Sequence, residues 1–405
     1  MSGTDLLDGF DLAALPGAST REAAAARVRA DGWPTKRDEA WHYTDLAAGL
    51  RGFALGPAPV VDVEAELPEG QRVVFVNGRF DAARSAAPEW VGRLSDAALG
   101  DAALGDAARG GVVVALNTAL AEDGVAITLA PGQQGGTLFL VALAAGRGEA
   151  MPAIAPRHRI ALGAGATLTL IETARGEGSY LHAPVFEVDL GEGARLNHYR
   201  LQDESAEAVH VATIFAEIAG GAGYESFTLN RGARLSRNET HARLGGKAAD
   251  VHLNAAQLLN GTQHGDVTTV VRHDAPNCAS RQTVKSVLAG AARGVFQGRI
   301  EVDRIAQKTD GYQMNQALLL SDEAEIDSKP ELEIFADDVK CSHGATIGAL
   351  DPEQLFYLRS RGVPEAEAKS ILIRAFLDEA LEPVTDEAAR AVFEAAIGAW
   401  WREGA

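Results

Sequence analysis

The sequence is poor in cysteine, in net positive charge and in long apolar runs. Its 405 residues include two cysteines, Cys278 and Cys341, which are too few for a disulfide framework and favour a reducing compartment. The formal net charge of −19 disfavours nucleic acid and anionic membranes as partners. No apolar stretch is long enough to span a membrane, and residues 1–10 lack the basic start and apolar run of a signal peptide. We therefore expect a cytoplasmic protein whose partners are other proteins or cations.

Several catalytic motifs are also missing from the sequence. The segment GGKA at residues 245–248 lacks both the leading glycine and the hydroxyl residue of a phosphate-binding loop. The sequence has no Gly-x-Ser-x-Gly elbow, no His-Glu-x-x-His and no paired Cys-x-x-Cys. The chain therefore has no self-contained machinery for ATP hydrolysis, acyl transfer or zinc hydrolysis, and we expect it not to be an enzyme.

The middle of the chain repeats short apolar or β-branched runs that end in glycine turns, from about residue 110 to residue 348. The segment GAGATL at residues 163–168 recurs as GEGARL at 191–196, a spacing of 28 residues. Such a period is typical of solenoids, and strands without helical patterns between them favour a β-helix. A two-sheet β-sandwich is the alternative. The longest apolar run, residues 138–145, is expected to form a buried strand.

The N-terminal region favours helices. Ser19 and Glu22 have the spacing of a capping box, and Gly32 can end the helix that follows. The aromatic segment WHY at residues 41–43 is interpreted as a packing anchor. Strands are expected from Val73 onward, where a short apolar run meets the turn signal Asn-Gly.

The C-terminal region favours three helices. Asp351 is a good N-cap before a proline at the first helical position, and Gly362 can end this helix. Pro364 can open the second helix, Pro383 can end it, and Thr385 can cap the third. The apolar faces of these helices either pack on the β region or form a docking surface. The predicted parts are a helical region at residues 1–72, a β region with a β-helix core at 73–348 and a helical domain at 349–405.

Histidines are the main candidates for metal ligands. His241, His252, His264 and His273 are loosely spaced, and histidines on strands usually form hydrogen bonds rather than ligate metal. His273 lies near Cys278 in a turn-like segment that we interpret as structural.

Cys341 and His343 form a more promising pair. In a strand, residues two apart point to the same face, so the thiol and the imidazole project together. Both side chains can ligate iron, copper or zinc, but two ligands are too few for a closed tetrahedral site. Either another chain completes the site, or the two residues are a buried cysteine and a hydrogen-bonded histidine.

The sequence resembles the SufB/SufD family in patches that span nearly the whole chain. The similarity is longest between residues 264 and 362, with QGRI (297–300), QKTDGY (307–312), NQALLLS (315–321), KPELEI (329–334), ADDVKCSHGAT (336–346) and QLFYLRSRG (354–362). It is weaker at GWPTK (32–36), EAWHYT (39–44) and VNGRF (76–80). Within the family the chain is more similar to SufD, because Ala324 replaces the cluster-building cysteine of SufB and Gly344 replaces its glutamate.

The resemblance implies a fold and a set of partners. It implies a right-handed parallel β-helix with an N-terminal helical region and a C-terminal helical domain. The partners would be a SufB-like scaffold at the end of the β-helix and a SufC-like ABC ATPase on the C-terminal helices. The residues expected at the ATPase interface are Leu355, Phe356, Tyr357, Arg361, Ile371 and Phe376.

The resemblance also implies a role in iron–sulfur cluster assembly. Iron or a cluster would be shared transiently with the SufB-like partner, with His343 and Cys341 near the interface as its ligands on this chain. A reduced flavin is associated with such complexes, but no motif here identifies a flavin site. The alternatives are a purely structural adaptor without iron ligation, a homodimer joined at the same end, and a β-helix enzyme acting on carbohydrate through clustered carboxylates.

Overall fold

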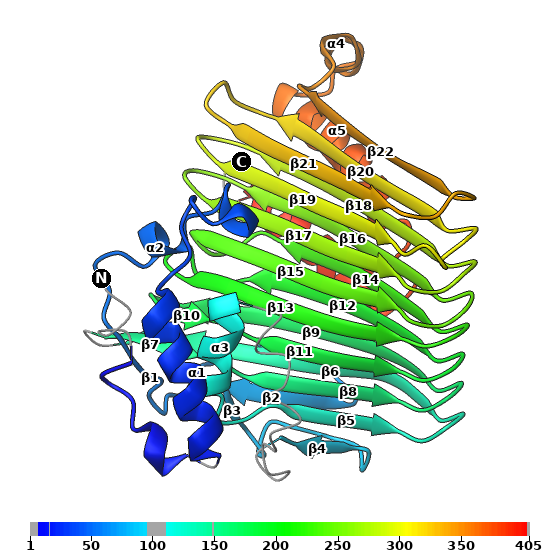
Figure 1. The fold of residues 1–405 in the computed structure, drawn as a ribbon. Helices are drawn as coiled ribbons and strands as arrows, with labels where there is room; N and C mark the ends of the chain where they lie inside the picture. The colour runs from blue at the N-terminus through cyan, green and yellow to red at the C-terminus, as the bar shows by residue number, and fades with distance from the viewer. Residues whose placement is uncertain (1–6, 16, 95–110, 148–149, 403–405) are drawn as a thin grey trace.

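The protein is a β-solenoid of about 8 turns with helices near both ends of the chain (Figure 1). The computed structural model describes residues 7–15, 17–94, 111–147 and 150–402. Among these residues, no helix combines the length and the apolar character needed to cross a membrane. Because the strands wind into a solenoid, the predicted β-helix is confirmed and the β-sandwich alternative is wrong.

Successive strands of the solenoid alternate between two sheets. The first sheet contains, in spatial order, β21 (Glu325–Ile334), β19 (Arg293–Val302), β17 (His264–His273), β15 (Leu235–Leu244), β13 (Val209–Ile218), β11 (Val185–Leu190), β8 (Arg157–Leu162), β5 (Val125–Leu129) and β4 (Val91–Arg93). The second contains β22 (Lys340–Gly348), β20 (Asp310–Leu319), β18 (Ala279–Leu288), β16 (Asp250–Leu259), β14 (Gly223–Asn230), β12 (Arg195–Asp203), β9 (Thr167–Glu177), β6 (Gln134–Ala145), β2 (Arg72–Val76) and β3 (Arg79–Phe80). A side ladder on the first sheet consists of β1 (Leu55–Pro57), β7 (Met151–Ile154) and β10 (Leu181–His182).

The repeat period sets the register between neighbouring turns. Leu168 on β9 pairs in parallel with Leu196 on β12, and these residues hold the same place in the two copies of the repeat. The 28-residue spacing is therefore the length of one turn of the solenoid at this point. Stacked turns bury side chains from both sheets in one continuous apolar core, in which Leu168 and Leu196 are almost fully buried. The predicted turn at Asn77 is also confirmed, because Asn77 and Gly78 have positive φ and join β2 to β3 in an antiparallel hairpin.

The N-terminal helices pack beside the first sheet. They are η2 (Leu12–Ala14), α1 (Ala18–Asp31), η3 (Glu39–Trp41), α2 (Leu46–Gly49) and α3 (Gly111–Leu120), of which α1 lies against α3 (Figure 1). Gly32 ends α1 with φ 65° as predicted, but Gly17 occupies the N-cap, so the Ser19 capping box is wrong. The expectation of strands from Val73 onward is wrong at α3, which is a helix. Its described side chains from Val112 to Leu120 are all buried. A segment that is buried on all sides shows no amphipathic period, and its tertiary contacts override β propensity.

The C-terminal helices have two different environments. They are α4 (Pro352–Ser360), α5 (Glu365–Leu381) and α6 (Glu387–Arg402). Helices α5 and α6 pack on the outer face of the second sheet, where Phe393 contacts Phe227 with ring centroids 4.9 Å apart. Helix α4 has no buried residue and projects beyond the end of the solenoid (Figure 1). Asp351 caps α4 as predicted, but a backbone amide in the first turn of α6 donates to Asp386 rather than to Thr385.

Candidate functional site

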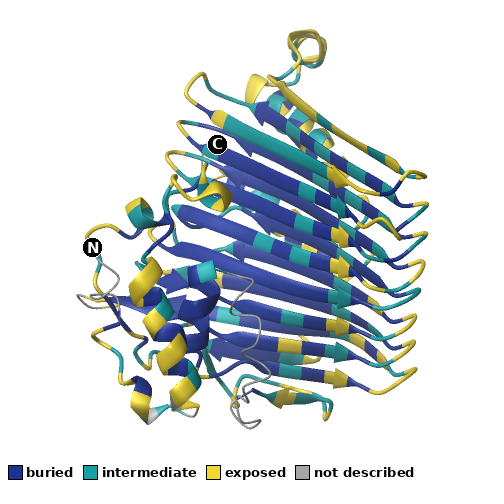
Figure 2. Ribbon diagram, viewed as in Figure 1, coloured by how far each residue is buried: buried dark blue, intermediate teal, exposed yellow. Residues whose placement is uncertain are grey.

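The solenoid finishes in an open end formed by β21 and β22. These strands end the two sheets, and none of their residues is buried (Figure 2). Large apolar side chains are exposed there, with Phe335 64% and Ile347 59% accessible. An unpaired strand edge that carries exposed apolar side chains is a surface suited to pairing with another protein.

Cys341 and His343 lie on β22, the last strand of the solenoid. Cys341 pairs with Gly311 of β20 and packs against the interior cluster that contains Ile300 and Val302. Burial raises the pKa of the Cys341 thiol, so this group is protonated at neutral pH. His343, two residues further along the same strand, belongs to the same face and is exposed. The structure therefore places the pair together at the open end.

A column of buried amides lies beneath His343. In the parallel ladder, Gln282 pairs with Gln313, and Gln313 pairs with His343. Gln313 and the nearby Asn315 are almost fully buried, and their side-chain amides have no hydrogen-bond partner. Buried amides without partners are uncommon because each costs about 1–3 kcal/mol. The interior that leads to His343 thus contains buried polar side chains without hydrogen-bond partners.

The chemistry available at the open end is that of an incomplete site. One thiol and one imidazole offer two good ligands for iron, and a tetrahedral site needs four. Any stable iron or cluster site at this end would require donors from another molecule.

The residues predicted at the ATPase interface lie on α4, at its C-cap and on α5. Phe356 and Tyr357 on α4 are 73% and 56% exposed, and the Arg361 guanidinium lies 4.4 Å from the centre of the Tyr357 ring. On α5, Ile371 is 43% exposed. Leu355 is partly buried. Phe376 is also partly buried and packs on the second sheet, where the Lys285 ammonium lies 4.4 Å from its ring.

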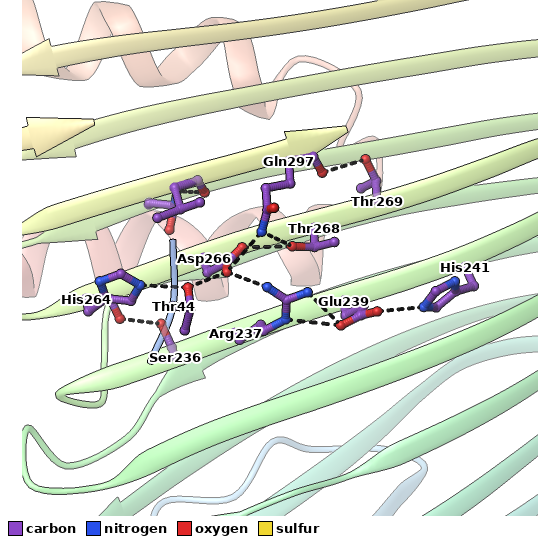
Figure 3. Close-up of polar contacts among 12 residues, drawn as sticks. Thr44, Ser236, Arg237, Glu239, His241, His264, Asp266, Thr268, Thr269 and Gln297 are labelled. Atoms are coloured by element: carbon purple, nitrogen blue, oxygen red, sulfur yellow. Dashed lines mark hydrogen bonds and ion pairs between the residues drawn. The ribbon is translucent and has the colours of Figure 1, made fainter. Parts of the chain in front are cut away.

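A buried ionic network fixes the N-terminal segment to the first sheet (Figure 3). The fully buried guanidinium of Arg237 donates to Asp266 at 2.6 Å and to Glu239 at 2.9 Å. Trp41 covers Arg237 at 4.2 Å, and the Thr44 hydroxyl donates to Asp266 at 2.5 Å. The aromatic segment therefore acts as a packing anchor, as predicted.

The strand histidines form polar contacts with single neighbours, as expected. His241 lies 2.7 Å from Glu239, and His252 lies 2.8 Å from Glu225. The other two, His264 and His273, contact hydroxyl groups of Thr44 and Ser280, both at 2.9 Å. His273 and Cys278 are both buried beside a turn, in line with the structural interpretation.

The sequence analysis missed a compact group of potential ligands. Among the described residues, His182, Glu204 and His210 are the one set of three whose ligand atoms all lie within 4.8 Å of one another. A signal for this group was present, because His182 and His210 are one repeat of 28 residues apart and so stack in adjacent turns.

Comparison with known proteins identifies the family. A family model described as SUF system FeS cluster assembly, SufBD core domain, matches residues 144–376. The chain is 33% identical over 376 residues to the iron-sulfur cluster assembly protein SufD of Escherichia coli, covering 91% of this chain and 89% of the relative. A SufBD family protein of Synechocystis is 30% identical over 397 residues, covering 90% of this chain and 86% of the relative. The chloroplastic protein ABCI7 of Arabidopsis thaliana is 36% identical over 186 residues, which is 46% of this chain and 39% of the relative.

The chain belongs to the SufBD family. It is a SufD-like member of that family. The family domain covers both the central turns and the open end, so Cys341 and His343 lie inside the part of the chain that matches it.

Proposed function

We propose that this SufD-like chain is a non-enzymatic, cytoplasmic scaffold subunit of a SufBCD complex. Its open end pairs with a SufB-like scaffold, and a SufC-like ABC ATPase docks on its C-terminal helices and drives the cycle. The role in iron–sulfur cluster assembly rests on family membership. The observation that carries the rest is the unfinished end of the solenoid, which joins exposed apolar side chains to an incomplete ligand pair.

The pairing step follows from the edge strands. Backbone groups of β21 and β22 can continue their ladders into a second β-helix, and Phe335 and Ile347 would become buried in that junction. His343 and Cys341 would then face the partner, which supplies the missing ligands for transient iron or for a growing cluster. A homodimer through the same end would also satisfy the strand edges, and its two copies of the pair would together offer four ligands.

The docking step follows from helix α4. Its exposed Phe356 and Tyr357 are not needed for folding, because α4 buries no residue in this chain. Helix α5 links α4 to the second sheet through buried Ile373 and Leu377. A force that an ATPase applies to α4 would thus pass through α5 to strands β16 and β18 of the second sheet.

The test is anaerobic co-expression of the chain with a SufB-like protein and a SufC-like ATPase. We expect His343→Ala to leave the three-component complex intact by native mass but to remove most of its visible cluster absorbance. The matched control is His252→Ala, on the strand surface, which should keep that absorbance. A normal cluster yield in the His343 variant would favour a purely structural adaptor over an iron-binding subunit.

The ATPase surface is tested by Phe356→Glu combined with Tyr357→Glu. This double variant should lose the SufC-like subunit and keep the SufB-like one, since the charges prevent burial of α4. Val60→Glu is the control, because Val60 is 88% exposed on the N-terminal part of the chain. Retention of the ATPase by the double variant would overturn the proposed docking site. Point variants are preferable to deletion of the C-terminal domain, which would uncover Phe227 on the second sheet.

A further inference from the structure

A second group of potential ligands lies inside the solenoid, away from the open end. His182 is on β10 and His210 is on β13, and these strands pair in parallel with the two histidines directly opposite each other. Glu204 follows β12 and precedes β13. The ring centroids of the two histidines are 5.2 Å apart. A short strand, a connecting segment and a second strand thus bring three donors to one point.

The donors are close together and shielded from solvent. The Nδ1 atom of His182 lies 2.9 Å from one carboxylate oxygen of Glu204, and the Nδ1 atom of His210 lies 2.6 Å from the other. The exposed fractions of His182, Glu204 and His210 are 2%, 5% and 0%. Gln202 also donates to Glu204, at 3.0 Å, which orients the carboxylate. A hydrogen bond of this kind orients a carboxylate so that it can ligate a metal ion.

His210 is not satisfied by this arrangement. Its Nδ1 atom lies 2.6 Å from the Glu204 carboxylate, but its Nε2 atom is also buried and has no hydrogen-bond partner. A buried ring nitrogen without a partner is costly, and the contact of Nδ1 with Glu204 alone would leave that cost in place. An ion between the three side chains would use a lone pair of His210 and remove it.

We propose that His182, Glu204 and His210 hold one divalent transition-metal ion of the zinc or ferrous iron type. Two imidazoles and one carboxylate are a donor set that such ions favour, and that calcium, magnesium and soft cuprous ions do not. A small enclosed cavity borders His182 and Glu204, and it is of about the size needed for a water molecule as a fourth ligand.

The site would be structural. Its ligands are buried within the turns around β10, β12 and β13, so the ion would bind as these turns close during folding. It would strengthen the link between β13 and the two-residue strand β10, which pair at two positions only. This site is independent of Cys341 and His343, because it uses none of the residues of the open end.

The test uses the full chain with Cys341→Ser and His343→Ala, so that the open end cannot contribute ligands. We expect this parent to retain about one zinc ion per chain after folding with zinc and desalting, measured by elemental analysis. Glu204→Gln in the same background should fall to the background level. The matched control is Glu239→Gln, which alters another carboxylate that contacts a histidine and should keep the ion.

A second measurement keeps the proposal falsifiable if the Glu204 variant folds poorly. The parent folded with Co²⁺ should show visible d–d absorption without a thiolate charge-transfer band, as expected for nitrogen and oxygen ligands. Chelation in mild denaturant should lower the melting temperature of the parent but not that of Glu204→Gln. Absence of bound metal in the parent, full retention by Glu204→Gln, or a thiolate band that implicates Cys278 would each overturn the assignment.

Discussion

The central turns of the solenoid and its last two strands share one backbone pattern but differ in burial. Strand β13, in the middle, is buried at nine of its ten positions, whereas β21 and β22 have no buried residue. Ladder pairing alone therefore does not bury a strand. Burial needs neighbours on both sides, and the end of the solenoid lacks the second neighbour. The difference marks the end as the surface at which we propose that a partner binds.

The largest expected effect concerns core packing. Phe227→Ala in β14 should lower the free energy of unfolding by about 3–5 kcal/mol, because it leaves a cavity against Phe393. Phe335→Ala beside β21 should change it by less than about 0.5 kcal/mol, since this ring is 64% exposed. Urea denaturation of both variants tests the contrast, and similar losses would mean that the two regions do not differ as described.

A comparable loss is expected at the buried ionic network. Arg237→Ala should cost about 3–5 kcal/mol, because Asp266 and Glu239 would remain buried without their counter-ion. The half-exposed Arg243 also binds two carboxylates, but Arg243→Ala should cost no more than about 1 kcal/mol. Denaturation curves at neutral pH compare the free energies of unfolding of the two variants. An equal loss in both would show that burial does not decide how much these ion pairs stabilise the fold.

A smaller effect on the free energy of unfolding is expected from a change in pH. Burial lowers the pKa of His273 to about 4, so below the ordinary value of 6.5 the unfolded chain binds a proton that the folded chain does not. Stability from this group is present above pH 6.5 and is lost as the pH falls. The advantage of the wild type over His273→Gln should shrink by about 2 kcal/mol between pH 7 and pH 5.

His252 provides a control of opposite sign for the same experiment. Its hydrogen bond to Glu225 raises the pKa of His252, so its contribution is present at low pH and is lost as the pH rises through the folded value. The advantage of the wild type over His252→Gln should therefore grow between pH 7 and pH 5. Parallel trends for the two variants would contradict the assigned environments.

The smallest effect concerns the reactivity of the two cysteine thiols rather than the stability of the fold. Cys278 is 1% exposed and its thiol donates to the Gly246 carbonyl, whereas Cys341 is only partly buried at the open end. Iodoacetamide should modify Cys341 alone in the folded chain. Because burial raises the pKa of this thiol, the rate should reach half its maximum above the pH of an ordinary cysteine. Mass spectrometry identifies the modified residue, and modification of Cys278 would contradict the structure.

Repetition and capping chemistry made much of the fold predictable. The 28-residue repeat predicted a solenoid, in which Leu168 and Leu196 of the two copies pair, and Asp351 marked the start of α4 correctly. Both signals are local, because they depend on spacing or on side chains next to the backbone groups they satisfy. The prediction that the side chains of Cys341 and His343 lie on the same face followed in the same way, because side chains alternate between the two faces of a strand.

Other features needed contacts between distant segments. Helix α3 has the composition of a buried strand, and only its packing against α1 and the first sheet distinguishes the two. Gly17 and Asp386 took the capping roles expected of Ser19 and Thr385, because where each helix enters the fold decides which residue becomes the cap.

By itself, the sequence determined the family, the solenoid period and the placement of Cys341 and His343 on one face of the last strand. Those properties depend on neighbours along the chain or on spacing by whole repeats. Only the tertiary structure decided that Glu204 reaches His182 and His210, and that β21 and β22 remain uncovered. The physical reason is that burial and ligand geometry depend on which turns stack and where the stack stops, and neither is encoded in a single local pattern.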